Sequence, residues 1–162
     1  LKDAGIDIDI PEPYDTLEEN ARAKSKTIFE MTGKNCFSED TGLFVDALNG
    51  HPGVKTARYA GDKATNKENI EKLLANLNGV EKRTARFKTV ISLMQAGKEF
   101  QFEGVCEGEI IETPVGEKGF GYDAVFIPDG NEKTFAQMET EEKNIYSHRK
   151  KAMKKLIGFL SS

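Results

Sequence analysis

Two long alternating segments joined by a tight turn constrain the fold of this chain more than any other feature. From residue 85 to residue 94, apolar side chains recur at every second position, which is the pattern of a half-buried strand. Ala96-Gly97 then turns the chain into a second such segment, residues 98–111. Strands joined so tightly are antiparallel, so we expect a hairpin within a mixed sheet. Gly104 and Gly108 predict bulges or bends in its second strand. The face expected to be buried on the first strand comprises Ala85, Phe87, Thr89, Ile91 and Leu93.

Helices are expected on both sides of a central acidic segment. Thr16, with Glu19 three residues later, forms a capping-box pattern and opens a helix that should end near Thr32, before Gly33. Thr65 and Glu68 repeat the pattern before an apolar stripe that reaches residues 78–79. Further helical patterns begin at residue 140 and end near residue 160. The chain is therefore expected to be an α/β domain whose long mixed sheet is flanked by helices.

Shorter strand patterns surround the hairpin. Residues 6–10 alternate with period two, and residues 35–39, 43–48 and 122–127 read as short extended pieces. Pro128 ends the last of them. Thr41-Gly42 is expected to form a turn between the second and third.

Composition excludes several classes of protein. With 162 residues, the chain is expected to form a single domain, residues 1–162. The net charge of −4 is spread without a basic stripe, so nucleic-acid binding is not expected. Neither a membrane span nor a signal peptide is visible, which predicts a cytoplasmic protein. Cys36 and Cys106 lie far apart inside expected strands and are interpreted as small buried hydrophobic residues.

Two adjacent carboxylates, Glu39 and Asp40, are the first candidates for chemistry. They follow a short apolar strand, and a sheet can deliver acids to a cleft in this way. Carboxylates so placed can bind Mg²⁺, which prefers oxygen ligands and keeps waters for substrate phosphates. The alternative is a pair of solvated turn acids. Glu12, held between two prolines in a stiff, extended segment, is interpreted on its own as a surface loop acid.

Other candidates are a lysine and an aromatic, glycine-rich loop. Lys24 falls on the apolar stripe of the first expected helix, where it either snorkels to solvent or points a cation at an anionic ligand. Residues 116–121 are rich in glycine but lack the Walker spacing of a phosphate-binding loop. Phe120 and Tyr122 could offer their rings to a flat ligand, or could be core residues.

Three motifs follow one another along the chain. They comprise residues 38–61, residues 119–123, and a split third motif at 133–136, 142–144 and 147–149. In this order and spacing they resemble the signature of the inosine triphosphate pyrophosphatase family. Members of that family hydrolyse ITP, dITP and XTP to the monophosphate and pyrophosphate. The resemblance extends from about Ile8 to the C-terminus.

The resemblance implies a role for each matching residue. Asp40 would be the catalytic acid, working as general base or Mg²⁺ ligand, with Glu12 a further metal ligand and Glu39 a weaker candidate. Lys24 would contact the triphosphate. The residues implied to contact the substrate beyond this lysine are Thr41, Phe120, Gly121, Tyr122, Asp123, Lys143, His148 and Arg149. Arg149 is always charged and only donates hydrogen bonds, so it would favour a 6-keto purine over adenine.

The resemblance also implies two lobes around a central cleft, and a homodimer. The family begins with a strand and a Thr/Ser-x-Asn-x-x-Lys phosphate loop, which the sequence from Leu1 does not show. We therefore expect that first strand and loop to be missing from this sequence. Two alternatives stay open: a nucleotide-binding module without turnover, and a related pyrophosphatase with another base preference.

Overall fold

A five-stranded sheet organises the computed structural model, which describes residues 14–161. Its strands are β1 (Cys36–Val45), β2 (Pro52–Gly53), β3 (Thr84–Gln95), β4 (Lys98–Ile110) and β5 (Phe126–Pro128). They lie in the order β2-β1-β3-β4-β5, and each of the four pairings between described strands is antiparallel. The α/β class is confirmed, although within residues 14–161 the sheet is antiparallel and not mixed. The strand expected at 6–10, like Glu12, lies outside the described residues.

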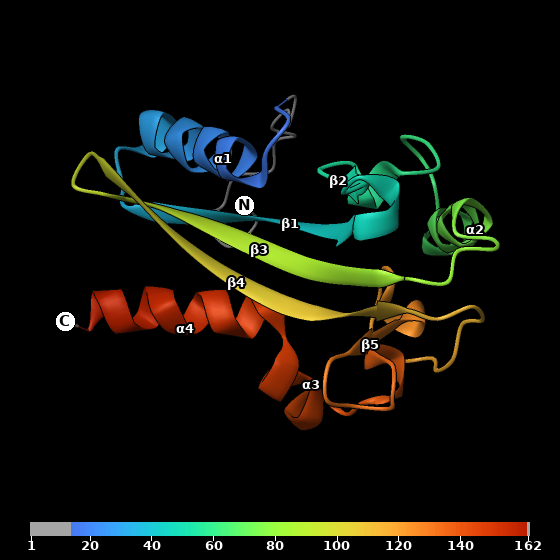
Figure 1. The fold of residues 1–162 in the computed structure, drawn as a ribbon. Coiled ribbons are helices and arrows are strands. Elements are labelled where there is room, and N and C mark those ends of the chain that lie inside the picture. The colour runs from blue at the N-terminus through green and yellow to red at the C-terminus, as the bar shows by residue number, and fades with distance from the viewer. Residues whose placement is uncertain (1–13, 162) are drawn as a thin grey trace.

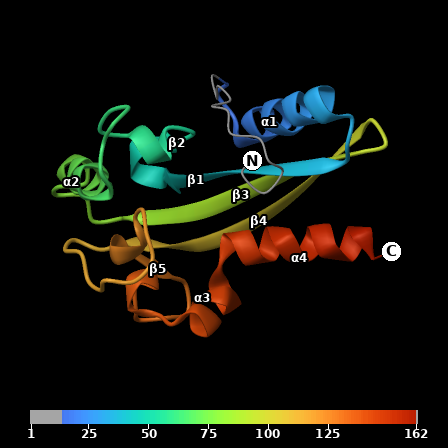
Figure 2. The ribbon, with the colours of Figure 1, turned by 180° about the vertical axis from the view of Figure 1, so that it is seen from behind.

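Two helices cover opposite faces of the sheet. Helix α1 (Leu17–Thr32) lies on one face and α4 (His148–Leu160) on the other, as Figure 1 and the reverse view in Figure 2 show. Helix α1 has the predicted bounds because Thr16 accepts a hydrogen bond from the Glu19 amide, while Gly33 closes the helix in the left-handed conformation. No helix in the described part of the chain is long and apolar enough to cross a membrane.

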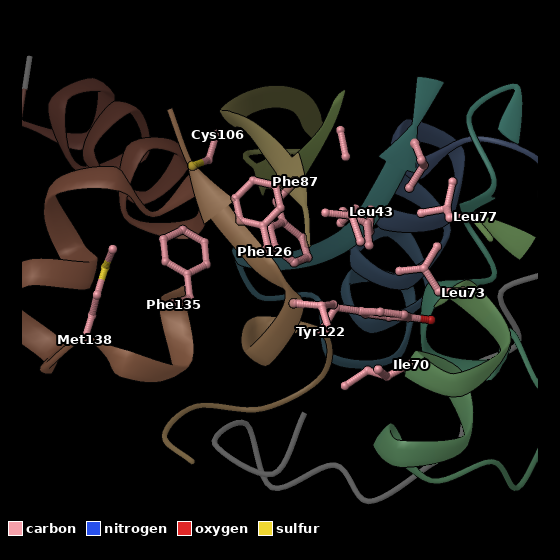
Figure 3. Close-up of a cluster of buried hydrophobic side chains, with 14 residues drawn as sticks. Leu43, Ile70, Leu73, Leu77, Phe87, Cys106, Tyr122, Phe126, Phe135 and Met138 are labelled. Atoms are coloured by element: carbon pink, nitrogen blue, oxygen red, sulfur yellow. The ribbon is translucent and has the colours of Figure 1, made fainter. Parts of the chain in front are cut away.

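Two smaller groups of elements flank one end of the sheet (Figure 1). One contains β2 and α2 (Asn66–Asn76), whose capping box at Thr65 and Glu68 is formed as predicted. The other contains β5 and α3 (Thr140–Tyr146). Side chains from both groups and from the sheet form the largest hydrophobic cluster, shown in Figure 3. The pocket described below is lined by residues of both groups, as expected for a two-lobed molecule.

The hairpin of β3 and β4 is regular throughout, which corrects the expected bulges. The register runs without a break from Thr84 opposite Glu109 to Gln95 opposite Lys98. Gly104 and Gly108 allow close packing instead. A Cβ at Gly104 would lie 2.0 Å from the His148 carbonyl oxygen, and one at Gly108 would lie 2.3 Å from the Ile127 oxygen. The two glycines therefore let α4 and β5 approach β4.

Helix α4 and the hydrophobic cluster shown in Figure 3 pack against the predicted buried face of β3. Ala85, Phe87, Thr89, Ile91 and Leu93 are all buried, as expected. The intervening residues Val90 and Ser92 are also buried, because α1 packs on the opposite face. Their burial was not apparent from the alternating pattern, which indicated only one buried face.

Candidate functional site

The acidic pair lies in the middle of a strand and not at its end. Strand β1 runs unbroken from Cys36 to Val45, so the turn expected at Thr41-Gly42 is absent. Gly42 serves a different purpose, because a Cβ there would lie 2.7 Å from the Gly53 oxygen of β2. Glycine at this position lets the neighbouring segment close over β1 without interrupting it.

Consecutive strand residues point to opposite faces, and this separates the two acids. Asp40 is opposite Val90 on the α1 face, and Glu39 is opposite Ile91 on the α4 face. The structure therefore does not place Glu39 and Asp40 side by side in one cleft, as the expected strand end would have done. Each acid has a different cationic partner.

Lys24 and Asp40 meet between α1 and the sheet. The Lys24 ammonium donates to the Glu39 carbonyl oxygen at 2.5 Å and lies 3.9 Å from Asp40 Oδ1. Their side chains are only 15% and 12% exposed. Lys24 thus points onto the sheet beside the acid and does not snorkel into solvent. The described residues at this end of the site form a cation–carboxylate pair that can face a polyanion.

A pocket of about 210 Å³ opens on the α4 face of the sheet. It brings together residues from all three motifs: Thr41, the segment Phe120 to Asp123, and the α3–α4 region with Lys143, His148 and Arg149. It also contains residues to which the sequence assigned no role in the site, namely Thr56, Ala57, Asn66, Asn69, Phe87 and Ser147. Thr41 is fixed within it by a 2.8 Å hydrogen bond between its hydroxyl and that of Thr89.

A buried carboxylate shapes the loop at the pocket mouth. Asp123 Oδ2 accepts hydrogen bonds from the Phe120 amide at 3.0 Å and from Lys143 Nζ at 2.7 Å. Gly119, at φ +77°, makes room for it, because a Cβ there would lie 2.1 Å from the same oxygen. The predicted glycine-rich loop therefore wraps a carboxylate and is not a phosphate cradle.

Phe120 is exposed at the rim, with two cations near its ring. Its side chain is 56% exposed, although Tyr122 in the same loop is buried. Lys143 Nζ lies 5.1 Å from the Phe120 ring centre, and Arg149 Cζ lies 4.7 Å from it. An exposed aromatic ring beside two cations suits a flat ligand that carries acceptors or negative charge.

His148 forms the inner wall of the pocket in its neutral form. Its ring stacks on Phe87 with centroids 4.7 Å apart, and no hydrogen-bond partner for its buried Nδ1 lies within the described chain. Burial, with Arg149 and Lys143 nearby, lowers the pKa of His148 to about 3. At neutral pH the ring can therefore both donate and accept hydrogen bonds.

Two sets of buried hydrogen bonds that the sequence did not reveal stabilise the wall of the pocket formed by residues 56–69 and Tyr122. The Tyr122 hydroxyl donates to the Thr56 carbonyl at 2.7 Å and so joins the two flanking groups. Burial raises the pKa of this hydroxyl well above its ordinary value, so it remains a donor. Asn69 accepts from the Ala60 amide and donates to the Ala57 carbonyl. In the sequence, the only indication of this role for Asn69 was its place beside the apolar stripe of a predicted helix.

The cysteines lie apart from these groups. Cys106 is buried, and burial raises the pKa of its thiol to about 11. Cys36 is partly buried. Both thiols are free, and the predicted burial is therefore met by Cys106 and only in part by Cys36.

The acids permit a magnesium site of a particular kind. Among residues 14–161, no group of three His, Cys, Asp or Glu side chains converges. Mg²⁺ is usually held by one or two carboxylates, with waters and substrate phosphates as the other ligands, so the single carboxylate of Asp40 could serve only as one ligand of such a set. Glu39 points to the other face, and Glu12 lies outside the described residues.

The fold and pocket define an α/β protein with an aromatic, cation-rimmed cavity on one sheet face. The sequence profile of the Ham1 family matches residues 1–159, and the chain belongs to this family. It is 50% identical over 161 residues to the dITP/XTP pyrophosphatase of Christiangramia forsetii, covering 99% of this chain and 85% of that protein. It is also 50% identical to the dITP/XTP pyrophosphatase of Caldanaerobacter subterraneus over 163 residues, covering 99% and 82% of the two chains.

Solved structures agree with this assignment. The Ham1 protein of Staphylococcus aureus superposes with a TM-score of 0.92 at 42% identity, covering 96% of this chain and 81% of the other. The dITP/XTP pyrophosphatase of Mycobacterium abscessus gives a TM-score of 0.83 at 37% identity, with 99% and 83% coverage.

Proposed function

We propose that this chain hydrolyses noncanonical purine nucleoside triphosphates, dITP, ITP and XTP, to the monophosphate and pyrophosphate. Its similarity over nearly its whole length to dITP/XTP pyrophosphatases supports the proposal. The structural observation that carries it is the pocket, which combines residues from all three motifs around an aromatic, cation-rimmed cavity. The substrate's base would enter that cavity on the α4 face. Its phosphates would pass Thr41 and the edge of β1 to reach Asp40 on the α1 face, because among the described residues β2 pairs with β1 only at Leu43 and Phe44.

At the phosphate end, Lys24 and Asp40 have complementary roles. Lys24 Nζ offsets the negative charge of the triphosphate, and the Asp40 carboxylate can orient a water and accept its proton. Asp40 would also hold Mg²⁺, which when bound neutralises charge that develops on the phosphates. The water oxygen bonds to the α-phosphorus, the bond from that phosphorus to the bridging oxygen breaks, and pyrophosphate leaves with that oxygen.

At the base end, donors would select the purine. Arg149 and Lys143 line the pocket and offer only N–H groups. A 6-keto oxygen can accept from such a donor, whereas the amino group of adenine would face another donor. Phe120 supplies a ring for stacking. This arrangement predicts a preference for inosine and xanthosine nucleotides over adenosine nucleotides.

A product assay tests the proposal. The chain, with Mg²⁺, is incubated separately with ITP, dITP, XTP, GTP, ATP and dTTP, and products are identified by chromatography. Pyrophosphate with IMP, dIMP or XMP is expected, and Asp40→Asn should abolish turnover while the variant still folds and unfolds cooperatively in urea. Orthophosphate with a diphosphate product would refute attack at the α-phosphorus. Binding of ITP without any product would instead indicate a nucleotide-binding module.

Two further properties belong to the proposal. We infer a homodimer and a cytoplasmic location on the family resemblance. Sedimentation equilibrium at micromolar concentration tests the first, and a monomeric mass would exclude a stable dimer. Fractionation of cells that produce the native protein tests the second.

A further inference from the structure

We propose that Glu39 is a positioning residue for Arg149 and thereby sets base selectivity. It orients Arg149 in the cavity proposed to bind the purine, called the base pocket below. This inference rests on the proposed function, because it concerns the same pocket. It gives the two neighbouring acids separate tasks: Asp40 acts at the phosphate end on one face of the sheet, and Glu39 acts at the base end on the other.

The contact between the two side chains is direct. Arg149 Nε lies 3.5 Å from Glu39 Oε1, with side-chain exposures of 39% and 40%. Arg149 also lies over the Phe120 ring, with Cζ 4.7 Å from the ring centre. The guanidinium therefore lies between an aromatic ring on the pocket loop and a carboxylate on β1, which is at ion-pair distance from its Nε but forms no hydrogen bond with it.

The base of the Glu39 side chain is itself fixed. Its residue pairs with Ile91 in the sheet, and its carbonyl oxygen accepts a hydrogen bond from Lys24 at 2.5 Å. A side chain that starts from such an anchored backbone can restrict the longer arginine. Without Glu39, among the contacts described only the Phe120 ring would hold Arg149, and fixing the guanidinium would cost more free energy when substrate binds.

A hollow beside the base pocket supports this assignment. It is lined by Glu39 and by Lys143, Ser147 and Arg149, and these last three residues also line the base pocket. Glu39 is thus adjacent to the base pocket through shared residues. Asp40, by contrast, reaches the α1 face. This geometry favours an action through Arg149 over metal binding beside Asp40.

The test compares Glu39→Gln with a matched control, Glu107→Gln. Glu107 also forms an ion pair with an arginine, Arg86, and the two side chains are 46% and 39% exposed. It does not line the base pocket. For each variant we would measure kcat and KM for ITP and ATP, the Mg²⁺ concentration for half-maximal rate, and IMP binding by calorimetry. Urea unfolding verifies that both variants fold.

We expect Glu39→Gln to raise KM for ITP and weaken IMP binding about two- to fivefold, the range for a partly exposed ion pair. The preference for ITP over ATP should fall in proportion, while kcat and the Mg²⁺ requirement change little. In an Arg149→Ala background the same substitution should have no further effect, because Glu39 acts through that arginine. Glu107→Gln should leave every value unchanged.

Two results would overturn the inference. One is an unchanged ITP-to-ATP preference and unchanged IMP affinity in Glu39→Gln. The other is a lower kcat with a raised Mg²⁺ requirement that persists in the Arg149→Ala background, since that pattern belongs to a metal ligand. Absence of pyrophosphate release by the wild-type chain would instead refute the proposed function, and IMP binding would still report on the Glu39–Arg149 pair.

Discussion

Replacing Gly104 by alanine should damage both stability and the base pocket. A Cβ at this position would lie 2.0 Å from the His148 carbonyl oxygen, 2.6 Å from the Ala152 amide nitrogen and 2.9 Å from Lys151 Cβ. Two of these neighbours are backbone atoms of α4, so no flexible side chain can yield. The first turns of α4 must move away from β4, and they carry His148 and Arg149.

The expected cost follows from the geometry. Overpacking a tight interior costs about 1–3 kcal/mol, and a helix displacement places this substitution at the upper end, about 3 kcal/mol. Urea unfolding would measure this loss. Because His148 and Arg149 move with the helix, KM for ITP should rise more than kcat falls.

Gly158→Ala provides a control in the same helix. Apart from its chain neighbours and its own stretch of helix backbone, no atom of the described residues lies within 4 Å of a Cβ at Gly158. Alanine there should therefore stabilise the helix by about 0.5–1 kcal/mol and leave KM unchanged. A Gly104→Ala protein as stable as the wild type, with the same KM, would show that the close approach of α4 to β4 is not tight. The reasoning would then be refuted.

Three other substitutions test the pocket walls. The pKa of His148 is about 3 in the fold against an ordinary 6.5. The unfolded chain therefore binds the extra proton, and stability should fall by up to about 1.4 kcal/mol per unit as pH drops from 6.5 toward 3. In His148→Gln this part of the slope, followed by urea midpoints, should disappear; an unchanged slope would contradict burial of the neutral ring. Tyr122→Phe leaves the buried Thr56 carbonyl without its donor and should cost about 1–3 kcal/mol by the same assay, so a loss below 0.5 kcal/mol would count against the bond. Asp123→Ala removes the acceptor of Lys143, so it should cost about 1.5–3 kcal/mol and raise KM for ITP; steady-state kinetics with an unaltered KM would exclude a role in shaping the pocket.

Local signals in the sequence predicted most element boundaries. The caps at Thr16, Gly33 and Thr65 each act within a few residues, and they correctly define the start of α1, its end and the start of α2. The turn residues Ala96-Gly97 correctly predicted the hairpin, because such a short turn can only join strands that pair with each other. Helix α2 ends at Asn76, slightly before the predicted 78–79. These features need no information about the rest of the chain.

Glycines in the sheet were the main source of wrong predictions. Gly42, Gly104 and Gly108 were interpreted as turns, bends or bulges, which are local roles. In the structure each one makes room for a segment distant in sequence: β2, α4 and β5 respectively. The sequence does not reveal which segment approaches, so it cannot distinguish a glycine that bends a strand from one that admits a neighbour.

The motifs predicted part of the pocket lining, since Thr41, Phe120 to Asp123, Lys143, His148 and Arg149 all line it. Only the tertiary structure decided how the acids are divided. Because β1 continues through Gly42 and successive side chains alternate, Asp40 meets Lys24 on one face and Glu39 meets Arg149 on the other. Two neighbours in the sequence thus occupy opposite sides of the sheet, since the face that each residue takes is fixed by the pairing of whole strands.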